Sequence, residues 1–454
     1  MLTRRLGLPI LLCGIALSVL GPSRAFGQFV VDCTGNTPGA YTTINSVVPL
    51  LTNGAVVQIT GPCTENVTIG GLDNLWIGAP WGQTALLQGS LTINGMQNLF
   101  LYGLNVTGST GNGISISNSS NVALDACASS NNVNFGLNIS DSTVFVQNTG
   151  TFNNNGSNGI NASGAGDIGF DGSAGPINIS NNACNGIELQ DGEMNANGNL
   201  IISNNKSSCA PAPQLTGDAA GYGIQLQGHA RAVLYVWNLA AGPDVISGNQ
   251  AGGVDVNEGS EMSLSGSAPG STGPWQTNVI EGNGPVGVYV GMGSQLTLWN
   301  GVQITNEPDA GVDVFGHSQV LINGDDQISN NATGPESTYP TRAGVRVDGN
   351  SEAFVRGGQI SQNGGPGILE LDNSSVDISG ATFASNVGGT IVCDSSSWLV
   401  SDQPTRPGPS GFGQPCNVPN NFGPRFHGLS FPQRSDNSRI QAQEARYQKL
   451  ISLR

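Results

Sequence analysis

The strongest constraint on the fold of this chain is a repeated pattern, Asn-x-x-x-Gly followed by an aliphatic residue, any residue and a second aliphatic residue. Its glycines lie 23 residues apart in the first and last units, and further apart in the middle of the chain. A fixed period of this length is typical of a solenoid, and the wider spacings predict the same unit with loop insertions. The full pattern occurs at Gly136, Gly159, Gly186, Gly253, Gly287 and Gly367, and a changed or displaced Asn accompanies Gly113, Gly223, Gly311 and Gly344.

Within each unit the aliphatic residues alternate with other residues, and this period of two predicts β-strands. A second aliphatic pair follows, as in Val122 and Leu124, and a third short strand ends in segments such as Ile202-Ser203-Asn204. Three short strands in one unit make one rung of a parallel β-helix, whose rungs bury their apolar faces by stacking. The same step extends the pattern upstream to residues 90–93 and downstream to residues 390–393.

The asparagine and the glycine of the pattern both have structural explanations. Asparagines at the same turn of successive rungs are expected to point inward and to form a ladder of hydrogen bonds, roughly 4.8 Å from rung to rung. The glycine is expected to adopt a turn conformation with positive φ. Neither residue type therefore needs a catalytic role.

The composition agrees with a neutral, glycine-rich β-structure. The 454 residues include 67 Gly, and only 10% are charged. Collagen would need Gly at every third position, and ordinary disorder would need more charge. The net charge is −16, and residues 29–420 carry 29 acidic and six basic residues. This acidic body excludes nucleic acid as its partner.

The two ends of the chain differ from the body. Arg4 and Arg5 precede an apolar run that ends at Leu20, which predicts a signal peptide and a secreted, periplasmic or cell-surface protein. The run is short for a membrane span, and no later stretch predicts a transmembrane helix. The expected organisation is a signal peptide at 1–28, an N-terminal cap with the first strand at 29–64, the β-helix at 65–400, a Pro/Gly-rich linker at 401–436 and a basic helix or tail at 437–454.

Seven cysteines remain after removal of the signal peptide, and they suggest three local pairs, although seven cysteines allow many connectivities. Cys127 is left over, in a setting that predicts a buried packing residue. None of the cysteine spacings matches a zinc site, so no metal is expected there. The expected disulfides are Cys33–Cys63, Cys184–Cys209 and Cys393–Cys416.

The segment from Tyr41-Thr42-Thr43-Ile44 through Gly61-Pro62-Cys63-Thr64-Glu65 resembles the start of pectin-lyase-like right-handed β-helix proteins. The rungs from about residue 66 to 400 are similar to the same superfamily. The resemblance implies an all-β, right-handed parallel β-helix. The superfamily includes polysaccharide lyases, hydrolases, pectin esterases, uronate epimerases and non-catalytic surface proteins, so the resemblance alone indicates no chemistry.

The motifs of the well-known enzymes of that superfamily are missing. Asp325-Asp326 is the only acidic pair of the polygalacturonase type, Gly228-His229-Ala230 departs from Gly-His-Gly, and Arg-Ile-Lys does not occur. A pectate-lyase-like site would need calcium-binding acids beside a basic residue, and the body offers few basic residues. If the protein is an enzyme, we expect a polysaccharide hydrolase or lyase.

One outward position of the repeat does carry residues of functional type. The residue two positions after each repeat glycine is Ser or Asn in the first rungs. From Glu188 onward it is of a type common in binding and catalytic sites: acidic, amide, aromatic or basic. Asp255 and Asp313 flank Tyr289, two rungs apart, so roughly 9.5 Å separates their backbones. This separation is at the upper edge for an inverting carboxylate pair. The series, which we call the stripe, runs Ser115, Asn138, Asn161, Glu188, Gln225, Asp255, Tyr289, Asp313 and Arg346.

We therefore expect binding or processing of an extracellular polysaccharide along the stripe. Asp255 and Asp313 would be the catalytic acid/base pair, Tyr289 would stack on a sugar, and Arg346 would pair with a uronate. The remaining residues expected to bind substrate are Glu188, Gln225 and Asp348.

The alternative is a non-catalytic, adhesin-like surface protein in which the stripe is an exposed β-face that tolerates polar residues. No cofactor is expected except calcium, which the acidic body could bind, although the Gly-Gly-x-Gly-x-Asp repeat of calcium-loaded β-rolls is missing. The acidic body would repel a uronate polymer unless Arg346, calcium or the tail compensates. A neutral glycan, or no substrate at all, is therefore a serious alternative.

Overall fold

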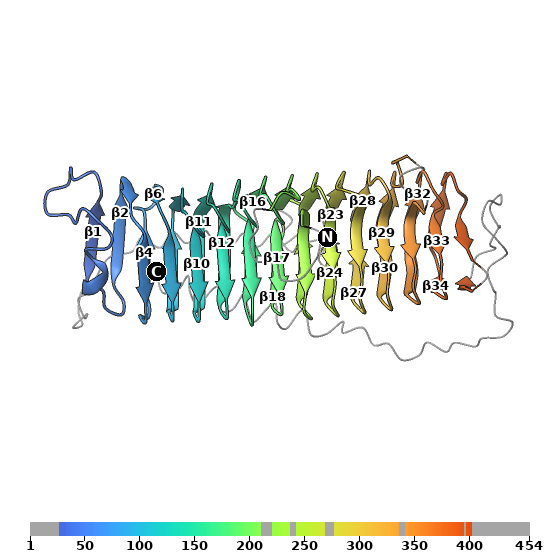
Figure 1. Cartoon of the computed structure of the whole chain (residues 1–454), viewed down its shortest axis with the longest axis horizontal. Coiled ribbons are helices and arrows are strands. Elements are labelled where there is room, and N and C mark those ends of the chain that lie inside the picture. The colour runs from blue at the N-terminus through green and yellow to red at the C-terminus, as the bar shows by residue number, and fades with distance from the viewer. Residues whose placement is uncertain are drawn as a thin grey trace, which may run out of the picture.

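The chain is a long solenoid in a computed structural model that describes residues 27–209, 220–236, 242–267, 277–335, 341–394 and 396–401 (Figure 1). The strands run across the long axis and follow one another from the blue N-terminal end to the orange C-terminal end. The predicted signal peptide, most of the linker and the predicted C-terminal helix lie outside the described residues. None of the described segments forms an apolar helix of membrane-spanning length.

Each rung contributes one strand to a sheet of 13 parallel strands, which we call sheet B. The chain returns to this sheet once per turn, so strands that are neighbours in the sheet belong to successive rungs. The strands of sheet B are β4 (Val67–Gly70), β7 (Leu91–Asn94), β10 (Ile114–Ser117), β12 (Leu137–Ser140), β14 (Ile160–Ser163), β17 (Ile187–Gln190), β20 (Tyr222–Gln227), β23 (Gly252–Val256), β26 (Val286–Val290), β29 (Ala310–Val314), β31 (Ala343–Val347), β33 (Ile368–Glu370) and β36 (Ile391–Cys393).

The remaining strands form a 24-stranded sheet, sheet A, which bends to make the second and third faces of the coil. The second face holds β1 (Gln28–Asp32), β2 (Val56–Thr60), β5 (Trp76–Gly78), β8 (Gln97–Tyr102), β11 (Ser120–Ser130), β13 (Thr143–Thr151), β15 (Asp167–Asp171), β18 (Glu193–Asn197), β21 (Arg231–Val236), β24 (Glu261–Ser267), β27 (Gln295–Trp299), β30 (Gln319–Ser329), β32 (Glu352–Ser361), β34 (Ser375–Ile378) and β37 (Trp398–Ser401). The third face holds β3 (Pro62–Thr64), β6 (Ala85–Gln88), β9 (Leu104–Thr107), β16 (Ile177–Ser180), β19 (Leu200–Ser203), β22 (Val245–Ser247), β25 (Asn278–Glu281), β28 (Val302–Thr305) and β35 (Thr382–Ala384), together with the second halves of β11, β13, β30 and β32.

The predicted rungs are confirmed strand by strand. Ile114 pairs with Leu91 on one side and with Leu137 on the other, in parallel register. The extrapolated units at residues 90–93 and 390–393 are β7 and β36. Inward residues of all three faces form one continuous apolar core from Val31 to Leu399.

The predicted asparagine ladder is present inside the coil and is longer than the pattern indicates. Asn132 Nδ2 donates to Asn155 Oδ1 at 3.0 Å, and Asn155 Nδ2 donates to Asn182 Oδ1 at 3.0 Å. One rung departs from the series, because the ladder position is occupied by Glu307, whose carboxylate accepts from the backbone N–H and the side chain of Asn283. Burial raises the pKa of Glu307 to about 8. The further ladder members are Asn205, Asn249, Asn331, Asn363 and Asn386.

The expected positive φ at the repeat glycine is wrong. None of the repeat glycines is among the described residues with positive φ; the left-handed residue is the one before the ladder position, such as Asn154. Glycine is needed for space instead. A β-carbon on Gly136 would lie 2.6 Å from Asn155 Nδ2 and 2.6 Å from the carbonyl oxygen of Gly159, so the ladder and the next rung exclude any side chain.

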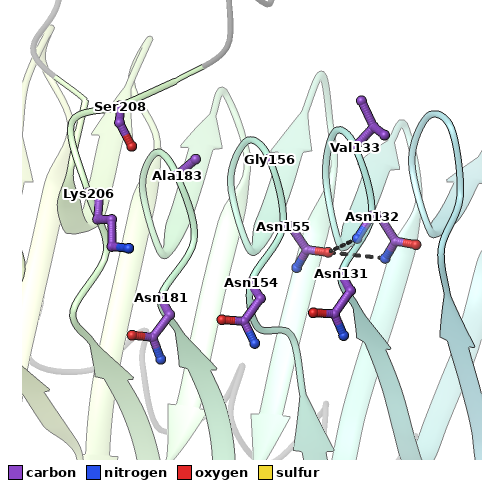
Figure 2. A pocket seen from close by; sticks show the side chains of 10 residues that line it. All are labelled: Asn131, Asn132, Val133, Asn154, Asn155, Gly156, Asn181, Ala183, Lys206 and Ser208. Carbon is purple, nitrogen blue, oxygen red and sulfur yellow. Dashed lines mark hydrogen bonds between the residues drawn. The ribbon is translucent and has the colours of Figure 1, made fainter.

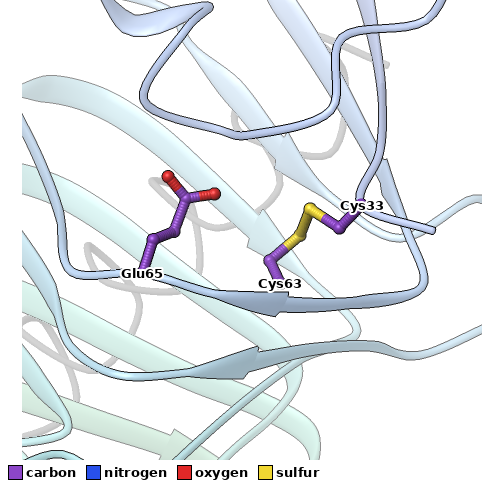
Figure 3. Close-up of side chains that lie close together, drawn as sticks. All are labelled: Cys33, Cys63 and Glu65. Atoms are coloured by element: carbon purple, nitrogen blue, oxygen red, sulfur yellow. A yellow bond between two sulfur atoms is a disulfide. The ribbon is translucent and has the colours of Figure 1, made fainter. Parts of the chain in front are cut away.

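The N-terminal segment, which the sequence predicts to be a cap, contains β1, which pairs with β2, and one turn of 3-10 helix, η1 (Val48–Leu50). The predicted Cys33–Cys63 disulfide is present and fixes this segment to the first rungs (Figure 3). The Glu65 carboxylate accepts hydrogen bonds from the backbone N–H groups of Ile44 at 2.6 Å and Asn45 at 2.9 Å. The cap is therefore held by one covalent bond and by two charge-assisted hydrogen bonds.

The other cysteines also follow the prediction where the structure describes them. Cys184 and Cys209 form a disulfide. Cys393 is disulfide-bonded, and its predicted partner Cys416 lies outside the described residues. Cys127 is a free, buried thiol whose pKa is raised to about 12 by burial, so it is an unreactive packing residue.

Candidate functional site

The stripe is a continuous row of side chains on sheet B. Each predicted member is the register partner of the next, so the row crosses nine successive rungs. Asp255 and Asp313 are both register partners of Tyr289, as the spacing predicts. Both residues are nearly buried: Asp255 is 2% exposed and Asp313 is 4% exposed.

Hydrogen bonds join the middle of the stripe, from Glu188 to Asp255. Glu188 Oε2 accepts from Asn158 Nδ2 at 2.7 Å, and Asn185 Nδ2 donates to Gln225 Oε1 at 2.7 Å. Gln225 Nε2 then donates to Asp255 Oδ2 at 3.0 Å. Asn158 and Asn185 were not predicted as site residues, although both directly precede a repeat glycine. These bonds fix the orientation of each amide and carboxylate before any ligand arrives.

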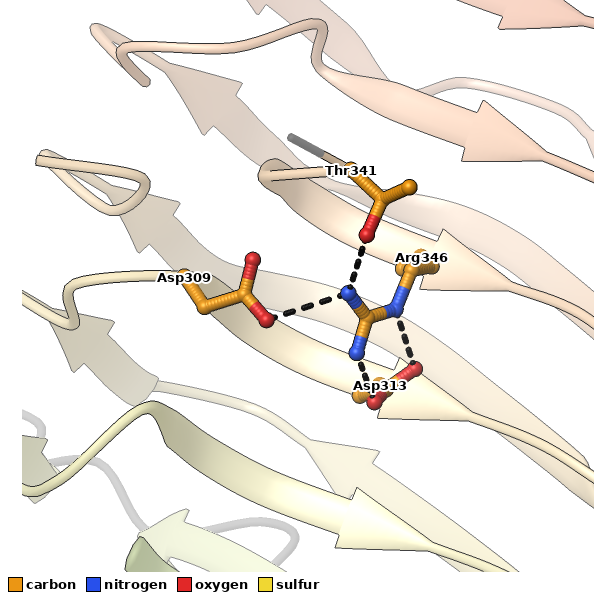
Figure 4. Close-up of polar contacts among 4 residues, drawn as sticks. All are labelled: Asp309, Asp313, Thr341 and Arg346. Atoms are coloured by element: carbon orange, nitrogen blue, oxygen red, sulfur yellow. Dashed lines mark hydrogen bonds and ion pairs between the residues drawn. The ribbon is translucent and has the colours of Figure 1, made fainter. Parts of the chain in front are cut away.

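The second half is a cluster of charges around Arg346 (Figure 4). The guanidinium donates to Asp313 Oδ1 from Nε at 2.8 Å and to Asp313 Oδ2 from Nη2, so it grips this carboxylate with two bonds. It also donates from Nη1 to Asp309 Oδ2 at 3.0 Å and to Thr341 Oγ1 at 2.8 Å. Asp309 and Thr341 were missed, because their contact with Arg346 depends on how adjacent rungs align.

The electrostatics of this cluster follow from burial. Burial raises the pKa of Asp309 above its ordinary value, although Arg346 acts in the opposite direction. For Arg346, burial would lower the pKa, but hydrogen bonds and charges from Asp313 and Asp309 outweigh it and raise the pKa. Oδ1 of Asp309 is buried and accepts no hydrogen bond. The cluster is therefore a rigid ion network with one unused acceptor.

Asp348 lies beyond the cluster, where the chain leaves β31. Its pKa is raised by burial and then by the nearby carboxylate of Asp372. Asp372 in turn donates its backbone N–H to Asp394 Oδ2 at 2.8 Å, and the other oxygen of Asp394 accepts from Ser396 and Ser397. The end of the stripe is therefore acidic.

A metal does not fit the one described group of close ligand atoms. Cys33, Cys63 and Glu65 lie near one another, as Figure 3 shows. The two sulfurs are joined in a disulfide and the carboxylate holds the backbone of the cap, so these atoms serve the fold.

A shallow pocket of about 400 Å³ lies at the corner where the third face turns into sheet B (Figure 2). Exposed Asn131, Asn154 and Asn181 occupy the same place in successive rungs, and Lys206 lines the pocket from the next rung. All three asparagines have positive φ, because each is the turn residue before a ladder asparagine. The row is a regular array of amide groups that the sequence reasoning did not single out as a surface.

The comparison with protein families matches residues 270–408 to a family model described as a right handed beta helix region. The predicted parallel β-helix is thus confirmed for the described residues, and the matched segment is of the right-handed class. No curated protein sequence matches the chain.

Solved structures match the chain only at low identity and with TM-scores below 0.5. The pectate lyase Pel9A is 14% identical over 61% of this chain and 76% of its own, with a TM-score of 0.41. The A-module of the mannuronan C-5 epimerase AlgE4 of Azotobacter vinelandii is 13% identical over 75% of this chain and 89% of its own, with a TM-score of 0.40. PfbA, a surface adhesin of Streptococcus pneumoniae, is 10% identical over 77% of this chain and 87% of its own, with a TM-score of 0.24. Similarities this low say nothing about the activity of this chain.

Proposed function

We propose that this chain is an exported β-helix protein that binds a neutral extracellular polysaccharide along the stripe from Glu188 to Arg346. The observation that carries the proposal is the pre-ordered row of polar groups around Tyr289. Its ring is the register partner of Asp255 on one side and of Asp313 on the other. A half-buried aromatic ring between oriented hydrogen-bonding groups suits a sugar, which has an apolar face and hydroxyl edges.

The charge of the stripe supports a neutral ligand. Glu188, Asp255, Asp309 and Asp313 are acidic, and Arg346 is the one basic residue among the described stripe and cluster residues. The contacts of Arg346 with two carboxylates leave little of its charge for a uronate. A uronate polymer would therefore be repelled, whereas hydroxyl groups would find both donors and acceptors.

Disulfide bonds support export. Disulfides persist in oxidising compartments and are rare in reducing ones. The chain carries Cys33–Cys63 and Cys184–Cys209, and Cys393 is also disulfide-bonded. The signal peptide proposed for residues 1–28 would place the protein in such a compartment.

Affinity electrophoresis tests the binding proposal. Full-length wild type, Tyr289→Ala and the control Asn161→Ala would run through gels cast with galactomannan, xylan or polygalacturonate. Asn161 belongs to the stripe but lies outside the Glu188–Arg346 part, so it is a matched control. We expect a neutral polymer to retard wild type and Asn161→Ala, and Tyr289→Ala to lose most of this retardation. Equal retardation of all three proteins would remove the stripe as the binding site.

A catalytic version is the second candidate, and one observation favours it. Asp255 and Asp313 lie two rungs apart, so roughly 9.5 Å separates their backbones by strand spacing, at the upper edge for an inverting carboxylate pair. Against it, both oxygens of Asp313 already accept hydrogen bonds from Arg346, so this carboxylate is engaged within the protein. Release of reducing ends from any of the three polymers, abolished by Asp255→Asn, would establish catalysis. Absence of release from all three would leave binding alone.

A further inference from the structure

Outside the stripe, four aromatic side chains lie together on the first rungs of sheet A; these rungs are blue in Figure 1. Trp76 in β5 is the register partner of Phe100 in β8, and Tyr102 ends β8. The ring of Trp81, from the turn after β5, stacks on Tyr102 with centroids 4.3 Å apart and planes 7° apart. The rings of Trp76 and Phe100 lie 6.4 Å from that of Tyr102. We call these four residues the aromatic platform.

The platform is pre-organised rather than loosely exposed. Gln83 donates its backbone N–H to the carbonyl of Pro80 at 2.9 Å, which closes a turn around Trp81. Gly82, with φ of 76°, donates its backbone N–H to the Tyr102 hydroxyl at 2.9 Å. The turn is thus tied to the ring on which Trp81 stacks. Trp81 is nevertheless 65% exposed, so its ring presents an aromatic face to solvent. Because the ring is already held in place, little side-chain entropy is lost when a ligand binds to it.

The row that contains Tyr102 continues as polar residues. Its next register partners are Asp125, Gln147 and Asp171. Gln147 Nε2 donates to Asp125 Oδ2 at 3.0 Å. Gln147 is only 2% exposed, and its Oε1 accepts no hydrogen bond. A buried side chain with an unused acceptor therefore lies two rungs from the aromatic ring, and the charged residues of this row are both acidic.

We propose that the aromatic platform is a second glycan-binding site, which takes a pyranose ring of a neutral polysaccharide. The apolar face of the sugar stacks on the exposed ring of Trp81. The acidic row disfavours a uronate. The platform lies on sheet A and the stripe on sheet B, so this inference does not depend on the function of the stripe.

The experiment compares full-length wild type with Trp81→Ala, Trp81→Phe and the control Met292→Ala, whose side chain is also exposed but lies far along the chain. Each protein is titrated with galactomannan, xylan and polygalacturonate while tryptophan fluorescence and binding heat are followed. We expect a neutral polymer to bind wild type with a change in tryptophan emission. Trp81→Ala should bind roughly tenfold more weakly and lose most of that change, while Trp81→Phe and Met292→Ala stay within about threefold of wild type.

Three results would overturn the proposal. The first is no binding of wild type to either neutral polymer, or binding to polygalacturonate alone. The second is unchanged affinity of Trp81→Ala, confirmed as folded by its circular dichroism and melting temperature. The third is a wild-type dimer in light scattering that Trp81→Ala converts to monomer, which would identify a second copy of the chain as the occupant. Because Tyr289→Ala is titrated in parallel, loss of binding at the platform is distinguishable from loss at the stripe.

Discussion

Replacing Glu307 by asparagine should stabilise the protein at alkaline pH and remove part of its pH dependence. Elsewhere in the ladder one amide oxygen accepts both bonds from the preceding asparagine, and the amide nitrogen donates to the next rung. Glu307 accepts from Asn283, whereas Asn331 accepts from the backbone N–H of Glu307 and not from a side-chain amide. The fully buried carboxyl must also either keep its proton or hold a charge away from water.

The sign and the size of this pH-dependent change in stability follow from the pKa of Glu307. The pKa of Glu307 is about 8 in the folded chain against an ordinary value of 4.5, because burial disfavours the charged form. The folded state therefore binds more protons than the unfolded state in this interval. The stabilisation is complete below pH 4.5 and is lost as the pH rises through 8. The shift corresponds to at most about 5 kcal/mol, and relaxation of the buried site leaves roughly 2 kcal/mol as the expected effect.

The assay is denaturant unfolding of wild type, Glu307→Asn and the control Glu258→Gln, an exposed acid, between pH 5 and pH 9. Other buried carboxyls with raised pKa, Asp244 and Glu370, lose their protons in both proteins and cancel in the difference. We expect the unfolding free energy of Glu307→Asn to rise relative to that of wild type as the pH rises, and Glu258→Gln to follow wild type. Parallel pH profiles of wild type and Glu307→Asn would refute the reasoning.

Three further predictions concern stability. Gly136→Ala should destabilise the protein by about 1–3 kcal/mol, because its β-carbon would collide with Asn155 and Gly159, whereas Gly111→Ala, with nothing within 4 Å, should be close to neutral in the same unfolding experiment. Reduction of the disulfides should lower the melting temperature, and Cys33→Ser with Cys63→Ser should reproduce the part that comes from the cap; a melting temperature insensitive to both would contradict the role given to the cap. Arg346→Ala should cost about 3–5 kcal/mol, because it leaves Asp313 and Asp309 buried without their cation, and the added variant Asp313→Asn should recover part of the loss; no recovery would argue against the ion network.

The sequence was sufficient for the coil and for the row of the stripe, because both depend on the repeat. Once Gly136 and Gly159 are recognised as equivalent positions, the parallel register of their rungs and the alignment of Asn138 with Asn161 follow. The ladder was predictable for the same reason. Its departure at Glu307 was harder to see, since the pattern alone does not reveal that a carboxylate can replace an amide at that place.

What the sequence could not provide was contact between positions that the repeat does not relate. The positive φ expected at Gly136 was wrong because the left-handed turn falls on Asn131, and the glycine is required by the neighbouring rung. The grip of Arg346 on Asp309 joins residues from different places in the unit. The stacking of Trp81 on Tyr102 depends on the turn at Gly82, whose backbone N–H donates to the Tyr102 hydroxyl, and the repeat pattern does not include this turn. Such contacts require the three-dimensional arrangement of side chains.

Binding of a glycan array by full-length wild type and Tyr289→Ala tests the central claim most directly. The array would display neutral and uronic-acid oligosaccharides of several lengths. Recognition of neutral chains by wild type, with a signal reduced roughly tenfold or more in a folded Tyr289→Ala protein, is the predicted result. A silent wild type, a preference for uronic-acid chains, or equal signals from the two proteins would contradict the assignment of the stripe to a neutral polysaccharide.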